Sequence, residues 1–286
     1  MDILPNIPVS TILNIFLLSL VAGLGTGIGG LIAIIRTPGR RSFGFLMGLT
    51  AGVMITLAFM ELLSEAWRTG GYITATIGFA AGAIFMFLLD YLAPHMRFGE
   101  VEVRNVNPNE VLSAMDSELE QRKRGFGRRG RKNHITDQKL FKTGILLAIG
   151  ITIHNIPEGI AVGAGYLHQP QFGIFIAMAI LLHNIPEGIA TALPLNKCGV
   201  CRWDAFRAAF LSGLAEPIGA LVAALFLTSF TSFLPAALAF AGGVMLFITL
   251  DELLPAAREH GHQHWTALGI ISGSIFVLLL SGIFGV

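Results

Sequence analysis

Long apolar stretches, separated by short connections that carry Gly, Pro or charged residues, make up most of this chain. A helix needs about 20 mostly apolar residues to cross a bilayer. Eight stretches reach that length, at residues 9–35, 43–67, 72–92, 142–166, 172–195, 203–229, 234–257 and 265–285. The pattern predicts an all-α, polytopic membrane protein with eight transmembrane helices in a single domain over residues 1–286. The first stretch is expected to be a retained helix, because the residues before it lack the basic segment of a cleavable signal peptide.

One long polar segment, residues 97–141, separates the third and fourth stretches. It contains QRKRGFGRRGRKN, a run of Gly, Arg and Lys with no apolar pattern. Low hydrophobicity combined with high net charge is typical of disordered segments. We therefore predict a basic, disordered loop within the membrane domain.

Lys and Arg are distributed unevenly among the connections. Those after the first, third, fifth and seventh stretches hold 18 of the 19 Lys and Arg residues, and the other connections hold only Arg68. Because Lys and Arg favour the cytoplasmic side, these connections, including the 97–141 loop, are predicted to be cytoplasmic. An even number of spans then places both termini outside the cytoplasm of a multi-pass protein in the cell (inner or plasma) membrane.

Composition agrees with a membrane protein. Hydrophobic residues make up 53% of the chain and charged residues 13%, whereas soluble domains have about 25% charged residues. The net charge of +1 indicates no particular partner. We therefore expect this protein to lie in the lipid bilayer and not to bind nucleic acid.

Acidic residues occur within the predicted spans, although no Lys or Arg lies well inside any span. They are Glu61, Glu65, Asp90, Glu158, Glu187, Glu216, Asp251 and Glu252. A charge at a helix centre costs about 2.5–3.5 kcal/mol, so such residues are functional by default. Without basic partners they must be protonated, lie in a water-filled cavity or bind cations. The alternative, hydrogen bonding by neutral carboxylic acids, has most weight for Glu65 and Asp90.

The octapeptide HNIPEGIA occurs twice, at residues 154–161 and 183–190. Both copies, and Glu216 in the sixth span, fall near the centres of their spans and therefore near the bilayer midplane. Each helical residue turns by about 100°, which places the Glu of each motif between its His and its Asn, one turn along. Imidazole and carboxylate groups together suit divalent transition metals. The pattern predicts a metal site between the fourth, fifth and sixth helices.

Each motif also contains a proline, Pro157 or Pro186. A proline inside a helix removes one backbone hydrogen bond and frees a carbonyl four residues earlier. Because interrupted helices at the midplane are typical of transporter sites, we expect both helices to be broken here. The alternative for a single motif is a kinked helix with a buried, hydrogen-bonded His, and the second copy disfavours it.

Together with GLAEPIGA in the sixth span and TLDELLP in the seventh, these motifs resemble the ZIP (Zrt/Irt-like) family of metal transporters, in particular its bacterial ZupT-like branch. The resemblance extends over nearly all eight spans. It implies import of zinc, and often of iron, manganese, cobalt or cadmium, as transported substrate with no organic cofactor. It also implies a homodimer, and movement of spans 1, 4, 5 and 6 against the other four.

The resemblance further implies a binuclear metal site. Residues that resemble its first site are His154, Glu158, His183 and Glu187, with Met54 from the second span. Residues that resemble its second site are Asn155, Asn184, Glu187 and Glu216. Glu187 would bridge the two ions. Some members have Gln in place of His183 and Asp in place of Asn184, so the second site here has one anion fewer.

Other polar residues are expected to outline a path across the membrane. Glu61 and Glu65 lie near the outer end of the second span and are expected at the entrance. Residues expected along the cytoplasmic exit are His95, Asp251, Glu252, His260, His262 and His264, and Asp90 is a further candidate on the path. Short His-rich tracts such as REHGHQHW are typical of metal binding; the alternative is a solvated polar turn.

Two further patterns resemble functional motifs but are interpreted without a catalytic or cofactor-binding role. GLGTGIGG at residues 23–30 contains G-x-G-x-x-G but follows no strand, so it fails the test for a dinucleotide site and instead favours close helix packing. Cys198 and Cys201 form a C-x-x-C pattern in a cytoplasmic connection, where a stable disulfide is not expected. They are interpreted as incidental thiols, with transient metal capture as the alternative.

Two functions other than transport remain open: an intramembrane metalloenzyme and a metal sensor. A zinc protease of this kind needs H-E-x-x-H, and the sequence contains no such motif. Acids spread from one end of the spans to the other favour a path over a closed site. We therefore predict a transporter, not an enzyme, that imports divalent transition metals.

The orientation is testable by cysteine labelling. A cysteine placed in the 97–141 loop should react with a membrane-impermeant thiol reagent only from the cytoplasmic side, and one at residue 2 only from outside, because the Lys- and Arg-rich connections are assigned to the cytoplasm. The reverse pattern would overturn both the orientation and the direction of import.

Overall fold

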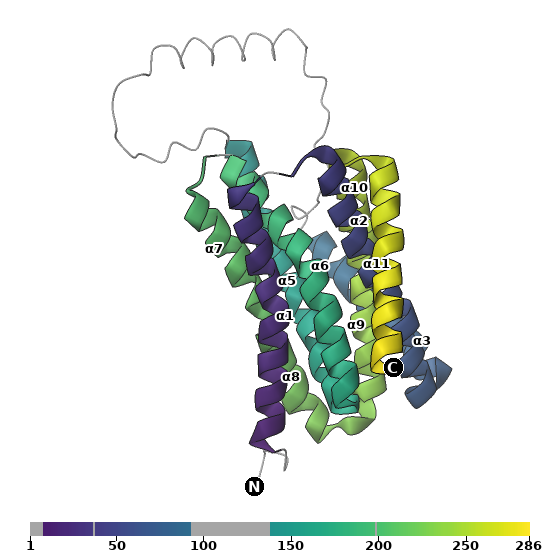
Figure 1. Ribbon diagram of the computed structural model, residues 1–286. Helices are drawn as coiled ribbons and strands as arrows, with labels where there is room; N and C mark the ends of the chain where they lie inside the picture. Colours follow the sequence, from purple (N-terminus) through teal and green to yellow (C-terminus); the bar gives the residue numbers. More distant parts are fainter. Residues whose placement is uncertain (1–7, 37, 93–137, 198) are drawn as a thin grey trace, which may run out of the picture.

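The computed structural model describes residues 8–36, 38–92, 138–197 and 199–286, and every regular element within these ranges is a helix (Figure 1). The predicted all-α class is therefore confirmed for this part of the chain. His95, Cys198 and residues 97–137 of the predicted loop lie outside the described residues. The predicted loop is too long at its far end, because a helix already begins at Gln138.

The helices follow one another along the chain as α1 (Val9–Ile35), α2 (Arg40–Thr56), η1 (Leu57–Leu63), α3 (Ser64–Leu92), α5 (Gln138–His168), α6 (Pro170–Lys197), α7 (Arg202–Gly213), α8 (Ala215–Ser229), η2 (Thr231–Phe233), α9 (Leu234–Ile248), η3 (Thr249–Leu253), α10 (Leu254–His260) and α11 (Gln263–Phe284). Of the short elements, η1 and η3 are π-helical and η2 is a 3₁₀ helix.

Six helical segments of the described chain are long and apolar enough to cross a membrane. They are Val9–Ile35, Arg40–Tyr91, Pro170–Lys197, Arg202–Ser229, Thr231–Arg258 and Gln263–Phe284. The second of these has 52 residues and is interrupted at Gly71, whose φ of 78° and ψ of 164° are readily adopted only by glycine. These helices fit a polytopic membrane protein.

The helices do not break where the motif prolines predict. Helix α5 continues through Pro157 and α6 through Pro186, so the expectation of an interruption at these residues is wrong. A proline removes one hydrogen bond of the helix, whereas neighbouring helices can hold the backbone on either side of it. The irregular backbone lies elsewhere: Leu214 separates α7 from α8, and the π-helical turns of η1 and η3 lie within the second and seventh predicted spans.

Glycines join some of these helices backbone to backbone. A Cβ atom added to Gly188 of α6 would overlap the carbonyl oxygen of Thr26 in α1, and one added to Gly159 of α5 would overlap that of Glu216 in α8. Glycine therefore permits a closeness that no other residue allows at these positions. Such contacts join α1, α5, α6, α7 and α8, which we call the first group.

The remaining long helices are joined in the same way. Gly48 of α2 faces the carbonyl oxygen of Thr266 in α11, and Gly243 of α9 faces that of Phe79 in α3. We call α2, η1, α3, α9, η3, α10 and α11 the second group. Packing between the two groups is sparser than packing within them and runs mainly from α5 to α9 and from α2 to α6. Figure 1 shows most of the second group on the right.

The glycine contacts predict a selective loss of stability. Gly188→Val should lower the free energy of unfolding by about 3 kcal/mol, the upper end of the usual range for overpacking, because a backbone carbonyl cannot move aside as a side chain can. Gly282→Val is the matched control, since no heavy atom lies within 4 Å of a Cβ at that position. Melting temperatures of the purified proteins measure the difference. Equal melting temperatures would contradict the close contact between α1 and α6.

Candidate metal centre

Seven polar side chains gather in the interior of the first group. Helix α5 contributes His154, Asn155 and Glu158, α6 contributes His183, Asn184 and Glu187, and the first turn of α8 contributes Glu216; all are buried. The two HNIPEGIA motifs and the sixth predicted span thus meet, as the sequence predicts. The repeat produces this meeting because α5 and α6 are consecutive helices that pack along each other.

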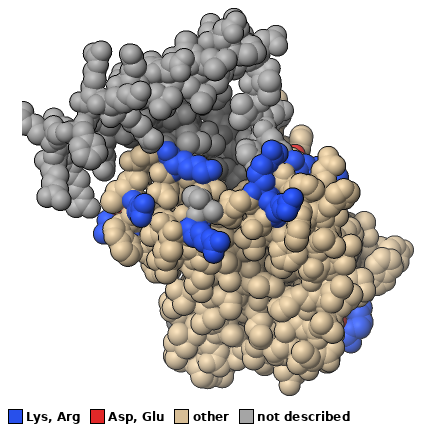
Figure 2. Space-filling model, turned by 45° about the horizontal axis from the view of Figure 1, so that its top comes forward, with Lys and Arg blue, Asp and Glu red and all other residues tan. Residues whose placement is uncertain are grey.

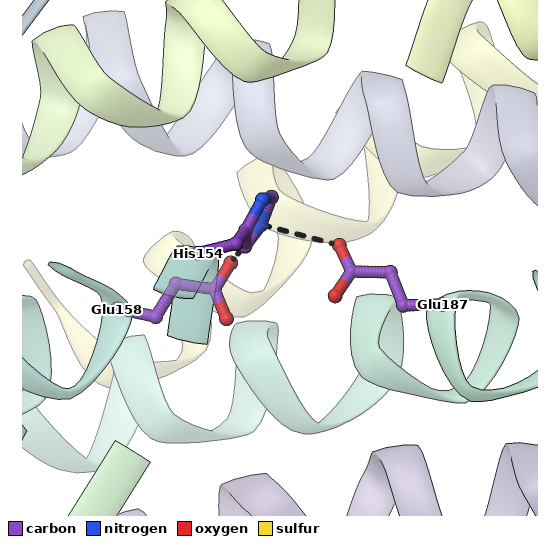
Figure 3. A group of neighbouring side chains, drawn as sticks. All are labelled: His154, Glu158 and Glu187. Carbon is purple, nitrogen blue, oxygen red and sulfur yellow. Dashed lines mark hydrogen bonds and ion pairs between the residues drawn. The ribbon is translucent and has the colours of Figure 1, made fainter. Parts of the chain in front are cut away.

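Histidines and carboxylates form one half of the cluster. Glu158 Oε1 lies 3.0 Å from His154 Nε2 and 2.8 Å from His183 Nε2. His154 Nε2 also lies 3.5 Å from Glu187 Oε1, the second contact drawn in Figure 3. One donor atom from each of His154, Glu158 and Glu187 lies within 4.8 Å of the others. Since zinc binds N and O ligands at about 2.0–2.2 Å, small adjustments would bring the three donors onto one ion.

Two amides and a carboxylate form the other half. Asn184 Nδ2 donates to Glu216 Oε1 and to the backbone oxygen of Ala22, the latter over 3.0 Å. Asn155 Nδ2 donates to the backbone oxygen of Ser212 over 2.9 Å. The NH₂ groups of both amides are therefore fixed, which leaves their carbonyl oxygens to the site.

Glu216 owes its position to the start of a helix. Helix α7 ends at Gly213, and α8 starts at Ala215, so Glu216 lies in its first turn. A carboxylate is favourable there because the helix dipole is positive at its N-terminus. Pro217 also suits this turn, where the backbone N–H has no partner within the helix.

Several buried acceptor atoms of this cluster have no hydrogen-bond donor within the part of the chain that the structure describes. They are Asn155 Oδ1, Glu158 Oε2, Asn184 Oδ1, Glu187 Oε1, Glu187 Oε2 and Glu216 Oε2. The 3.5 Å contact between His154 and Glu187 is too long for a good hydrogen bond. Burying polar acceptors without partners is costly, and a cation would offset that cost. The arrangement is therefore suited to bind divalent cations.

The second group reaches this cluster from the side. Glu252 of η3 is buried and interacts electrostatically with His154. Thr50 of α2 donates to the backbone oxygen of His183 over 3.3 Å. Met54, which the resemblance adds to the first metal site, is buried at the end of α2, and its sulfur lies 3.5 Å from the Thr249 hydroxyl.

Residues predicted along the path separate into two places. On one side of the cluster, Glu252 interacts electrostatically with Asp90 and Asp251. Near this side, the rings of His262, the N-cap of α11, and His264 in its first turn lie 5.8 Å apart, and the side chain of His260 lies outside the described residues. On the opposite side lie Glu61 and Glu65, whose charges interact.

The expectation that Glu65 lacks a basic partner is wrong. Arg68, one turn along the same helix, binds its carboxylate through Nε and Nη2 over 2.8 and 2.7 Å. His168 Nε2 lies 2.6 Å from Glu65 Oε1. His168 was not predicted to lie at this place, although a histidine at a short connection on the same predicted side as Arg68 was a usable signal.

Buried His, Asn and Glu side chains inside a helical membrane protein are typical of ion transporters, and comparison with known proteins gives the family. The family model described as "ZIP Zinc transporter" matches residues 97–281. The zinc transporter ZupT of Oceanobacillus iheyensis is 40% identical over 93% of this chain and 97% of its own. That of Akkermansia muciniphila is 39% identical over 94% and 97%. The chain belongs to the ZIP family, as its motifs predict, and is thus a membrane transporter and not an enzyme.

Cobalt(II) offers a spectroscopic test of the cluster. The purified protein should bind Co²⁺ with the visible absorption of an ion held by nitrogen and oxygen ligands. Glu158→Gln should weaken binding by more than about 100-fold, because even residues that only support a ligand contribute 10–100-fold. The control is Asp204→Asn, an exposed carboxylate paired with Arg207. Unchanged affinity in Glu158→Gln would remove this residue from the site.

Proposed function

We propose that this protein imports divalent transition-metal ions, zinc first, into the cytoplasm through a binuclear site formed by the seven clustered side chains. The observation that carries the proposal is the set of buried carboxylate and amide oxygens that lack hydrogen-bond donors. Similar proteins also support the proposal, because those of Oceanobacillus iheyensis and Akkermansia muciniphila are named zinc transporters. Iron, manganese, cobalt and cadmium are proposed as further substrates.

The two halves of the cluster suit two ions. His154, Glu158 and His183, joined by Glu158 Oε1, would hold the first ion, with Met54 beside them. Asn155, Asn184 and Glu216 would hold the second through oxygen atoms. Imidazole ligands suit zinc, whereas a set of oxygen ligands suits harder cations. Glu187 would bridge the ions, because neither of its oxygens has a hydrogen-bond donor.

Eight spans and a cytoplasmic basic face complete the proposed topology. Six candidate segments become eight if Gly71 divides the segment Arg40–Tyr91 and if α5, which carries the polar motif, also spans the bilayer. Most of the Lys and Arg side chains in Figure 2 lie at one end of the molecule, with one patch far from them. Positive residues favour the cytoplasm, so we assign this end, with the 97–141 loop, to the cytoplasm.

Transport is proposed to move the first group relative to the second. All seven clustered side chains belong to the first group, so the ions would travel with it. Glycine contacts hold each group together, while packing between the groups is sparser. Ions would arrive past Glu61 and Glu65 and leave past Glu252, Asp90 and Asp251. The homodimer stays a prediction from the resemblance, as does the absence of an organic cofactor.

Zinc uptake into sealed proteoliposomes tests this proposal and separates it from a metal sensor, which would bind zinc without uptake.

Three variants should differ in the uptake that they retain. Glu187→Gln should lose most uptake, because it removes the charge that both ions share. His154→Ala should also lose most uptake, because it removes an imidazole ligand of the first ion. Asn155→Ala should keep much more, because it removes only one neutral oxygen from the second site.

Metal content of the purified variants gives a second measurement. At matched protein amounts, Asn155→Ala should retain about one bound ion per chain, since only its second site is weakened, and Glu187→Gln about none. Uptake by Glu187→Gln at the rate of the unmodified protein would show that the bridging role is wrong.

A further inference from the structure

One close contact between a histidine and a carboxylate crosses from the first group to the second on the side opposite the basic end. His168, the last residue of α5, lies 2.6 Å through Nε2 from Glu65 Oε1 in the second group. The side chains are only 20% and 15% exposed. Both residues lie beside connections that the charge distribution assigns to the outside of the cell.

The acceptor in this contact has other partners on its own helix. Arg68 binds both oxygens of Glu65, over 2.8 and 2.7 Å, and the Thr69 hydroxyl donates to the Glu65 backbone oxygen over 2.7 Å. A neutral His168 with a proton on Nε2 is a sufficient donor, so the contact does not require a charged imidazole. The guanidinium also argues against a metal ion at this carboxylate, because it already supplies the positive charge.

Aromatic rings continue the contact toward the interior. The ring of His168 lies edge-on to that of Phe172, with centroids 5.9 Å apart. Phe172 stacks on Phe175 at 6.0 Å, and Phe175 lies 6.4 Å from Phe284 of α11 in the second group. Phe172 and Phe175 are buried. These rings thus connect the contact between His168 and Glu65 with α11 of the second group.

We propose that Glu65, clamped by Arg68, and His168 form a latch that holds the two groups together on the outer side and must open before a metal ion enters. This inference rests on the proposed movement of the first group against the second. Hydrogen bonds to a charged acceptor are roughly twice as strong as neutral ones, so one such contact is enough to shift a two-state equilibrium. When the latch opens, the ring of Phe172 becomes accessible from outside.

The test uses the full-length protein in liposomes with Phe172→Cys, Cys198→Ser and Cys201→Ser as the parent. A membrane-impermeant maleimide is added from the outer side, and the labelling rate of Cys at residue 172 is measured. His168→Phe keeps a ring against this position but removes the N–H donor. It should raise the labelling rate about three- to tenfold by increasing the fraction of open molecules.

Two matched variants isolate the hydrogen bond between the groups. His168→Gln restores an N–H donor and should label at nearly the parent rate. Tyr166→Phe removes the hydroxyl that Asn14 bonds over 2.9 Å within the first group and should also label like the parent. In the chain with Phe172 intact, His168→Phe should lower the apparent KM for external Zn²⁺ by a similar factor, because a larger fraction can bind metal.

The proposed latch is refuted if residue 172 is labelled no faster in His168→Phe than in the parent, or as fast in Tyr166→Phe as in His168→Phe. Should His168→Phe fail to fold, Glu65→Ala removes the acceptor of the same contact from the other group and decides in its place. Labelling requires no metal. Faster labelling in a protein that imports no zinc would refute the proposed substrate and leave the latch standing.

Discussion

Buried oxygen atoms that lack donors are the constraint on which the rest of this molecule depends. Glu158, Glu187 and Glu216 lie inside an apolar bundle, and no Lys or Arg among the described residues forms an ion pair with them. Two histidines and two amides give part of the compensation, and a bound cation would satisfy the acceptors that have no donor among the described residues. Under the proposed function, the transported ion supplies the positive charge that these acids need.

Close packing by glycine lets the helices that carry these acids act as one unit. Gly159 and Gly188 bring the backbones of neighbouring helices into contact near the site, which fixes the ligands relative to one another. The amides depend on the same packing, because the backbone oxygens of Ala22 and Ser212 orient them from α1 and α7. The positions of the clustered side chains thus depend directly on how closely these helices pack.

The second group supplies a different kind of contact. Glu252 acts on His154 by electrostatics, and Thr50 by a hydrogen bond of 3.3 Å to the backbone of His183. Both contacts are weaker than the bonds among the ligands. Such a sparsely packed boundary beside a close-packed group suits the proposed movement, because few contacts would break while the clustered side chains stay together.

Local features of the sequence determined the helical class, most span positions and the residues of the cluster. Hydrophobicity over about 20 residues and a turn of about 100° per residue are properties of the segment itself, so the two motifs predict their own ligand faces. Tertiary structure decided what depends on distant residues. It kept α5 and α6 continuous through Pro157 and Pro186, turned the amide oxygens into the site, and paired Glu65 with His168 from another helix. Each of these outcomes is decided by a neighbour far away in the chain, and no local pattern specifies that neighbour.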